Sequence, residues 1–175
     1  MMRCPWVGDL PMMITYHDEE WGVPLHDDRK LFEFLVLDAF QAGLSWAIVL
    51  KKREHFRKAF AQFHPKKIAK FTGRDVQRLL KDEGIIRNRL KIESTIKNAA
   101  AFLEAQKEFG SFDTYIWQFV GNKPLSHTIR TLKDYPAKTI ESDAMSKDLK
   151  MRGFAFVGST ICYAFMQAAG MVNDH

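Results

Sequence analysis

Apolar residues recur along most of the chain three and four positions apart, and no stretch keeps a two-residue alternation for the length of a strand. This spacing, with the capping and stop residues at the segment ends, predicts helices over about 27–40, 46–63, 72–84, 87–109, 111–121, 142–153 and 157–170. We therefore predict an all-α fold, formed by a single domain over residues 1–175.

The helix predicted over residues 27–40 carries an acid on its apolar side. With 3.6 residues per turn, Asp38 shares a stripe with Leu31 and Leu35, whereas Glu33 falls on the wetter side. Burial of a carboxylate is costly unless it is paired or hydrogen-bonded. Two interpretations stay open: a helix-terminal acid that meets an arginine or caps the next helix, and a functional carboxylate inside a pocket.

The first twenty residues lack a sustained period and contain two prolines, which predicts an irregular segment held by packed aromatic rings or by a metal. Three of the four tryptophans (Trp6, Trp21 and Trp46) and Tyr16 lie within the first 46 residues. Aromatic residues are typical of a core. Together with an inward carboxylate, however, flat rings would suit a pocket for a planar, cationic or amino-bearing ring.

The net charge of +5 is unevenly distributed. Residues 1–50 carry a net −5, residues 51–91 carry a net +10, and residues 92–175 are neutral. A basic block beside an acidic or neutral body indicates a polyanion binder. The alternative is a solvated lysine-rich helix face.

Within the basic block, residues 79–92 (LLKDEGIIRNRLKI) predict a helical hairpin that turns at Gly84 and continues into a helix bearing Arg87, Arg89 and Lys91. A hairpin of this kind can hold a DNA phosphate with backbone N–H groups and the positive start of the second helix. Helical hairpins with a glycine at the turn are also common without this function, and the second glycine of the DNA-binding type is replaced here by Ile86.

No apolar run approaches membrane-spanning length, and the first residues do not have the pattern of a signal peptide, so we expect no membrane association and a cytoplasmic location. In that compartment Cys4 and Cys162 favour a metal ligand or a buried thiol over a disulfide. Cys4, His17 and His175 are zinc-type ligands, although their spacing fits no short zinc-finger pattern.

Several strings of the sequence are unusual in combination: RCPWV, YHDEEWGVP, QAGLSW, LKKRE, GIIRNRLKI and the C-terminal SDAMSKDLKMRGFAFVGSTICYAFMQAAGMVNDH. Together they resemble the bacterial 3-methyladenine DNA glycosylase I family nearly from end to end. The resemblance implies a helix-hairpin-helix DNA glycosylase fold, with the hairpin over about 73–109 and two lobes flanking a base pocket. It also implies a monomeric, monofunctional base excision repair enzyme that acts on double-stranded DNA containing alkylated adenine.

The resemblance further implies roles for individual residues. The family lines its base pocket with aromatic rings at positions that match Tyr16, Trp21 and Trp46, with Trp6 close by. Asp38 stands where most members carry a glutamate that hydrogen-bonds the methylated base, so the implied catalytic set is Asp38, Tyr16 and Trp46. The implied DNA-binding set includes the loop residues that fill the gap left by the extruded nucleotide, Gly43 and Leu44, together with Gly84, Arg87, Arg89 and Lys91.

Two departures from the family pattern affect these expectations. Aspartate at position 38 shortens the reach of the carboxylate by one methylene, roughly 1.5 Å, and we expect Met13 and Phe40 to reshape the pocket wall in compensation. Cys4, His17 and His175 match three of the family's four structural zinc ligands. The fourth, a cysteine four residues beyond His175, is absent from this chain.

Two other functions remain open from the sequence. A non-catalytic binder of DNA structure would explain the basic block but not an acid among aromatic rings. A glycosylase with a preference for another alkylated base would follow if Asp38 alters the contact with the base. No lysine stands out as a Schiff-base nucleophile, so water is the expected acceptor of the sugar, without strand cleavage.

Overall fold

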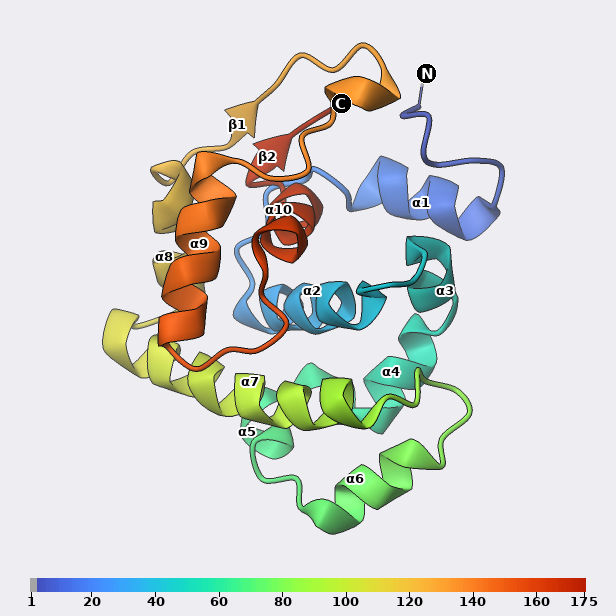
Figure 1. Cartoon of the computed structure of the whole chain (residues 1–175), viewed down its shortest axis with the longest axis vertical. Helices are drawn as coiled ribbons and strands as arrows, with labels where there is room; N and C mark the ends of the chain where they lie inside the picture. The colour runs from blue at the N-terminus through green and yellow to red at the C-terminus, as the bar shows by residue number, and fades with distance from the viewer. Residues whose placement is uncertain (1–2) are drawn as a thin grey trace.

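The computed structural model of the chain describes residues 3–175 and is mostly helical, as predicted (Figure 1). The α-helices are α1 (Pro11–Glu19), α2 (Asp28–Gln41), α3 (Trp46–Lys51), α4 (Arg53–Ala59), α5 (Pro65–Ile68), α6 (Gly73–Leu80), α7 (Arg89–Phe109), α8 (Phe112–Trp117), α9 (Ile140–Met151) and α10 (Ser159–Ala168). Short 3₁₀ turns follow at Ala61–Phe63, Gln118–Val120 and Leu132–Asp134. None of the helices in residues 3–175 combines the length and the apolar character needed to cross a membrane.

Helix α2 is the centre of the molecule. It begins after Asp27, whose carboxylate accepts a hydrogen bond from the backbone N–H of Lys30 at 2.9 Å, so the helix predicted here is confirmed. Every residue from Leu31 to Phe40 is buried. Helices α3, α7, α8 and α10 pack around it (Figure 1). Because α2 is buried along this whole stretch, its two acids, Glu33 and Asp38, are both removed from water, and the partners of each have to be found among the surrounding side chains or in a ligand.

The prediction of a single helix over residues 46–63 is wrong. The chain bends at Lys52 between α3 and α4, and the segment after α4 tightens into a 3₁₀ turn in which Ala61, Gln62 and Phe63 all have positive φ. Left-handed backbone at three successive residues cannot continue a right-handed helix. Phe63 is nevertheless fully buried, which explains why the apolar period runs through the break.

The irregular N-terminal segment is also corrected, because residues 11–19 form helix α1. Leu10 precedes it without a side-chain cap and Pro11 takes the first helical position, so the usual polar start signal is missing. Further along, α9 begins at Ile140 after the cap Thr139, two residues before the predicted start, and Ser142 is its third residue.

The all-helical prediction omits one small parallel sheet. Strand β1 (Leu125–Ser126) pairs with β2 (Val172–Asn173). The residues that follow the two strands, His127 and Asp174, are thereby brought side by side: the backbone N–H of His127 donates to the carbonyl of Asn173 at 3.1 Å. Two-residue strands have no alternation to detect, so the sequence pattern could not predict this sheet.

Candidate active site

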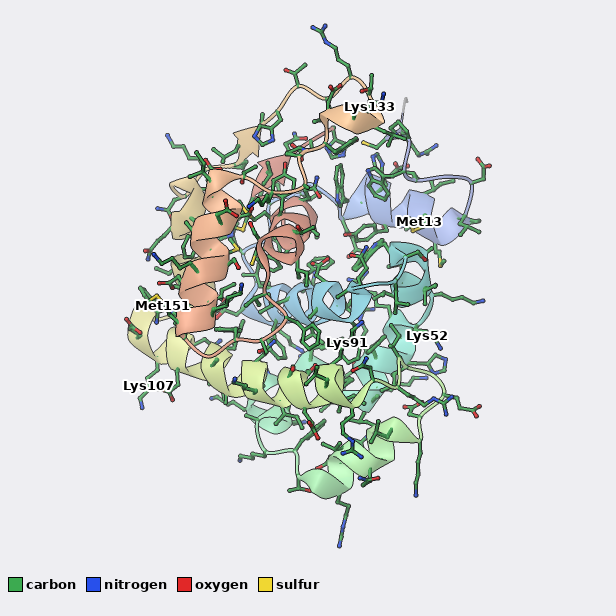
Figure 2. All side chains as sticks on the ribbon, viewed as in Figure 1. Met13, Lys52, Lys91, Lys107, Lys133 and Met151 are labelled. Carbon is green, nitrogen blue, oxygen red and sulfur yellow. The ribbon has the colours of Figure 1, made fainter. Side chains whose placement is uncertain are left out.

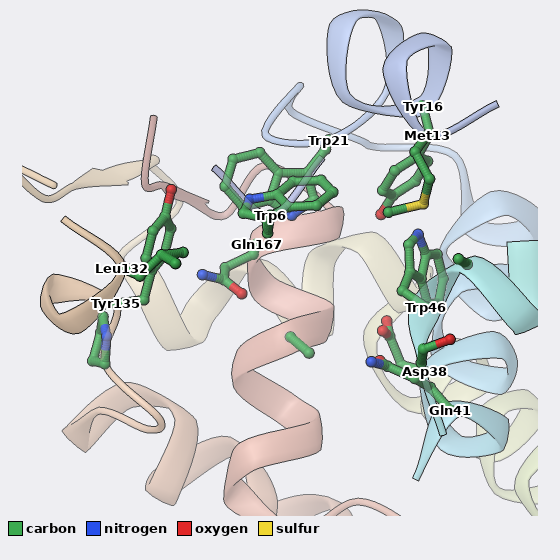
Figure 3. A pocket seen from close by; sticks show the side chains of 14 residues that line it. Trp6, Met13, Tyr16, Trp21, Asp38, Gln41, Trp46, Leu132, Tyr135 and Gln167 are labelled. Atoms are coloured by element: carbon green, nitrogen blue, oxygen red, sulfur yellow. The ribbon is translucent and has the colours of Figure 1, made fainter. Parts of the chain in front are cut away.

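A cavity lies where α1, α2, α3 and α10 meet the loop after β1 (Figure 3). Its volume is about 520 Å³, within the range typical of small-molecule sites. The lining combines aromatic and apolar side chains with a few polar groups, among them Trp6, Met13, Tyr16, Trp21, Asp38, Gln41, Trp46, Leu132, Tyr135, Pro136 and Gln167. The structure thus brings the predicted pocket residues Trp6, Met13, Tyr16, Trp21, Asp38 and Trp46 into one cavity.

Asp38 is the inward acid of this cavity, as its helical position predicts. Its side chain is only 4% exposed, and its Oδ2 has no hydrogen-bond partner among the described residues. Asp38 therefore neither meets an arginine nor caps the next helix, and the interpretation that remains is a carboxylate inside a pocket. Burial without compensation raises the pKa of the Asp38 carboxyl well above its usual range. The site holds an acceptor that is ready for a cationic or hydrogen-bonding ligand.

The rings around Asp38 form the walls of the cavity. Tyr16 and Trp46 lie with ring centroids 5.3 Å apart, and Trp6 packs edge-on against Trp21 at 4.9 Å. Burial, reinforced by the charge of Asp38, raises the pKa of Tyr16, so its hydroxyl stays protonated. The indole Nε1 of Trp46 is a buried donor without a partner among the described residues. The cavity therefore offers flat apolar faces together with a buried unpaired acceptor on Asp38 and a buried unpaired donor on Trp46.

Two predictions about α2 are corrected. Phe40 does not line the cavity: it is fully buried on the other side of the helix against Phe56 and Phe60, because two positions along an α-helix turn a side chain by about 200°. Glu33 is not on a wet face either. It is 7% exposed and accepts a hydrogen bond from Nε of Arg53 at 2.6 Å.

The loop between α2 and α3 carries the predicted wedge residues at the surface. Gly43 has a φ of +80°, a conformation that favours glycine, and it turns the chain between the two helices. Leu44 is 39% exposed, unusually open for a leucine beside a cavity. Ser45 then caps α3 by accepting from the backbone N–H of Ile48. The turn and the cap present an apolar side chain outward next to the cavity wall.

The hairpin between α6 and α7 differs from the prediction in its use of Gly84. The backbone N–H of Gly84 donates to the carboxylate of Asp82 at 2.8 Å and is not free for a phosphate. A Cβ at this position would lie 2.6 Å from Nδ1 of His55, so the glycine allows the hairpin to pack closely against α4. Arg87 and Arg89 are exposed beside it, as a DNA contact requires.

Lys91 belongs to the interior rather than to the DNA-facing surface. Its side chain is 8% exposed, and its ammonium donates to the backbone carbonyls of Phe40 at 2.8 Å and Ala42 at 2.6 Å. Figure 2 shows it between α7 and α2, whereas Lys107 of the same helix reaches outward. An ammonium group that already donates to two backbone carbonyls contributes little to phosphate binding, so the predicted role of Lys91 as a DNA contact is wrong. Its observed role is to hold the end of α2.

Comparison with known proteins identifies the family. The sequence profile of the methyladenine glycosylase family matches residues 6–175. The chain belongs to this family. DNA-3-methyladenine glycosylase 1 of Escherichia coli (strain K12) is 53% identical over 175 residues, which cover 100% of this chain and 94% of that protein.

Solved structures agree with this placement in the methyladenine glycosylase family. A crystal structure of a 3-methyladenine DNA glycosylase I matches with a TM-score of 0.97 at 52% identity, over 99% of this chain and 96% of the other. The 3-methyladenine DNA glycosylase I of Staphylococcus aureus, solved to explain recognition of 3-methyladenine, matches with a TM-score of 0.95 at 35% identity, over 99% and 92% of the two chains.

Of the three zinc-type residues, His17 and His175 lie side by side, and Cys4 shares the lining of a small pocket with His175. The ring of His17 lies 5.0 Å from that of His175, and Nδ1 of His17 donates to Asp18 at 2.9 Å, which leaves its buried Nε2 without a partner among the described residues. In residues 3–175, however, no three His, Cys, Asp or Glu side chains are grouped to hold a metal ion. Cys162 is a buried free thiol, as expected, and burial raises its pKa to about 12.

Sequence reasoning missed the far wall of the cavity. Leu132, Tyr135 and Pro136 come from the loop after β1, which has no helical period, and Gln167 comes from the apolar helix α10. The loop residues gave no signal, because they meet α1 and α2 only through the tertiary fold. Gln167 did give one: it interrupts the apolar run CYAFMQAAG.

Proposed function

We propose that this protein is a DNA-3-methyladenine glycosylase of base excision repair. Its family membership and its relatives supply the substrate class. The single observation that carries the proposal is the buried carboxylate of Asp38, which has no partner among the described residues and faces a cavity walled by aromatic rings. An alkylated adenine is flat, cationic and bears an amino group, and such a ring satisfies each of these features.

A base inside duplex DNA cannot reach this cavity, so the nucleotide must leave the stack, at a cost of a few kcal/mol that is least for a damaged base. In the proposed complex Arg87 and Arg89 hold the backbone beside the hairpin, which acts as the helix-hairpin-helix element of the superfamily. Leu44, exposed on its glycine turn, enters the vacated stack.

The chemistry asks little of the protein beyond recognition. 3-Methyladenine attached to the sugar already carries a positive charge and leaves as a neutral base, so no strong acid is needed. The ring stacks against Trp46, and Asp38 accepts a hydrogen bond from it, with Tyr16 assisting from the adjacent wall. Because no lysine lines the described cavity, water accepts the sugar and the DNA strand stays intact.

The first test is chromatography of the bases released from N-methylated duplex DNA. A peak of 3-methyladenine above the control without enzyme, and no 7-methylguanine, is the expected result, and it would also show that aspartate suffices at position 38. Trp46→Ala separates a glycosylase from a binder of DNA structure: a pure backbone binder should keep its affinity for DNA, whereas the glycosylase should lose release of 3-methyladenine. Folded protein that binds DNA and releases no base would overturn the proposal.

We also propose a structural Zn²⁺ held by Cys4, His17 and His175. The supporting observation is His17: its Nδ1 is held by Asp18, so its unpartnered Nε2 presents a lone pair beside His175, the arrangement usual for a metal-binding histidine. Metal analysis of purified protein should find about one zinc per chain, and Cys4→Ser should lower both the zinc content and the melting temperature. Protein purified without zinc that melts at the same temperature would contradict the site.

The remaining expectations follow from the substrate. The enzyme acts as a monomer in the bacterial cytoplasm, where its DNA lies. Sedimentation of the free protein should give the mass of one chain, 20.3 kDa.

A further inference from the structure

Gln167 stands out on α10 as a polar side chain on an otherwise apolar stretch of helix. It lies near the C-terminal end of the helix, and its side chain lines the cavity together with Trp6, Trp21 and Tyr135. Figure 3 shows it across the cavity from Asp38 and Trp46. A polar side chain on such a helix needs a hydrogen-bond partner, and Gln167 has one in Asp174.

The holding group is Asp174, which follows strand β2 and is fully buried. Its carboxylate accepts hydrogen bonds from Nε2 of Gln167 at 2.8 Å, from Nδ1 of His127 at 2.7 Å and from the hydroxyl of Tyr163. The small sheet explains the arrangement, because pairing of β1 with β2 places His127 and Asp174 together, within hydrogen-bonding distance of side chains of α10. Asp174 is thus a fixed acceptor with three donors.

This network fixes the orientation of the Gln167 amide. A carboxylate only accepts hydrogen bonds, so the amide must turn its NH₂ group toward Asp174. The carbonyl oxygen Oε1 is then left for the cavity, and none of the described residues donates a hydrogen bond to it. In Figure 3 the oxygen of Gln167 lies on the side that faces Asp38 and Trp46. The cavity therefore has a second acceptor, which is neutral and cannot rotate into a donor.

The positions of the two acceptors suggest different roles. In adenine the glycosidic nitrogen lies at the opposite end of the ring system from the amino group. A base whose amino-bearing edge is held by Asp38 therefore directs its glycosidic bond away from Asp38, and Gln167 lies across the cavity from Asp38 (Figure 3). We infer that Oε1 of Gln167 accepts a hydrogen bond from the water molecule that attacks the sugar, with Asp174 as the positioning residue behind it. The inference rests on the proposed glycosylase function.

The step balances without any further reagent. The oxygen of the water forms a bond to C1′ of the sugar, the bond between C1′ and the base nitrogen breaks, and its electron pair returns to the ring, which leaves as a neutral base. The proton lost by the added water passes to solvent, because a neutral amide cannot take it. Gln167 orients the nucleophile and does not deprotonate it, which suits a cationic leaving group.

The test is Gln167→Met, which keeps the approximate shape of the side chain and removes the acceptor. Release of 3-methyladenine from N-methylated duplex DNA in a single turnover should slow by about 10- to 100-fold, since misplacing a reacting group by about 1 Å can cost 10²-fold. Binding of free 3-methyladenine, followed by tryptophan fluorescence, should be unchanged. Gln118→Met, the same substitution at an exposed turn remote from the cavity lining, is the matched control and should keep the wild-type rate.

A second readout depends on the nucleophile alone. In aqueous methanol both water and methanol can attack C1′, and the ratio of methyl glycoside to hydrolysed sugar reports which one the site holds. The ratio should rise in Gln167→Met relative to the wild type. Because this ratio does not depend on the amount of folded enzyme, it decides the question even if the variant melts at a lower temperature.

Asp174→Asn tests the orientation of the amide. An asparagine can donate to Oε1 of Gln167 and let the amide turn over, which places NH₂ in the cavity, so excision should slow although Gln167 is intact. An unchanged rate and methanol ratio in Gln167→Met would overturn the inference, and so would weaker binding of free 3-methyladenine, which would make Gln167 a contact of the base. If the wild-type protein releases no base, the proposed function itself fails.

Discussion

Helix α2 carries two buried acids, and their surroundings are opposite. Glu33 accepts hydrogen bonds from Nε of Arg53 at 2.6 Å and from Nε of Arg57 at 3.0 Å. Asp38, little more than one helical turn further on and equally buried, has no partner for its Oδ2 among the described residues. A paired acid ties elements together, whereas an unpaired acid keeps a desolvation cost that only a ligand can offset.

The arginines of the first pair show how the difference arises. Arg53 also donates to both carboxylate oxygens of Glu20, each at 2.8 Å, so α4 is fastened to α2 and to the end of α1. Near Asp38 the neighbours are instead aromatic rings and a cavity. Burial fraction alone would place the two acids in one class, while the presence of a charge partner separates a structural residue from a recognition residue.

The largest expected effect comes from removing the unpaired acid. Asp38→Ala should lower the rate of 3-methyladenine release by about 10³-fold, the scale of losing one preorganised electrostatic contact in a water-excluded site. Affinity for undamaged duplex DNA should stay near the wild-type value, because the backbone contacts lie elsewhere. Single-turnover excision and fluorescence anisotropy measure the two quantities. A variant that loses DNA affinity instead would show that Asp38 is structural.

Removing the paired acid should have the reverse pattern. Glu33→Gln leaves the guanidinium of Arg53 buried with half of its charge compensation, so the free energy of unfolding should fall by about 3 kcal/mol. Urea denaturation measures this loss. The excision rate per folded molecule should be unchanged, and a large drop would mean that Glu33 also shapes the cavity.

The pH dependence of stability sharpens the contrast. An aspartate in an unfolded chain has a pKa of about 3.9, whereas burial raises the pKa of Asp38 in the folded protein. As the pH rises from about 4, the unfolded chain releases this proton first and is favoured, so the folded state loses stability until the pH passes the folded pKa. Asp38→Asn removes the effect.

The variant Asp38→Asn should therefore have a higher melting temperature than the wild type at neutral pH. The difference should shrink as the pH is lowered toward about 4, where both proteins carry a neutral side chain at this position. Thermal melts at several pH values give the comparison. If the melting temperature of the wild type instead rises relative to that of the variant as the pH increases, Asp38 has a charge partner in the folded protein.

The smallest expected effect is on the salt dependence of DNA binding. It compares two cations of the hairpin region, one without and one with partners inside the protein. Arg87 is exposed and Lys91 is committed to two carbonyls. Arg87→Ala should lower the slope of log affinity for DNA against log salt by about 0.9, the value for one phosphate contact. Lys91→Met should leave the slope unchanged. DNA-binding titrations at several salt concentrations measure the slopes. Equal slopes for the two variants would contradict the assignment of Arg87 to the DNA contact and of Lys91 to the interior.

Helical periodicity was enough to place Asp38 inward, but it failed for Glu33 and Phe40. The reason is that α2 is buried all round, so a polar residue on any side meets protein, and its partners lie in other helices. Periodicity also concealed the break after α4, since Phe63 keeps its apolar contacts through a left-handed backbone. Local spacing predicts which residues share a face, and it does not predict what covers that face.

The composition of the site was predictable in part for the same reason. The aromatic walls lie in the first 46 residues and could be grouped by their clustering in the sequence. Tyr135 and Gln167 join them only because the loop after β1 and the helix α10 close over the cavity. The network around Asp174 depends on a sheet of two-residue strands, which are too short to leave an alternating pattern in the sequence.

The ammonium of Lys91 has a mechanical consequence. It stands at the start of α7, just after the hairpin, and holds the last carbonyls before the turn that carries Leu44. Two hydrogen bonds therefore join the hairpin end of α7 to the loop that carries Leu44 and hold the two at a fixed spacing. In the proposed complex, the spacing between the arginines that contact the phosphates and the leucine that enters the base stack is thus set within the protein before DNA binds.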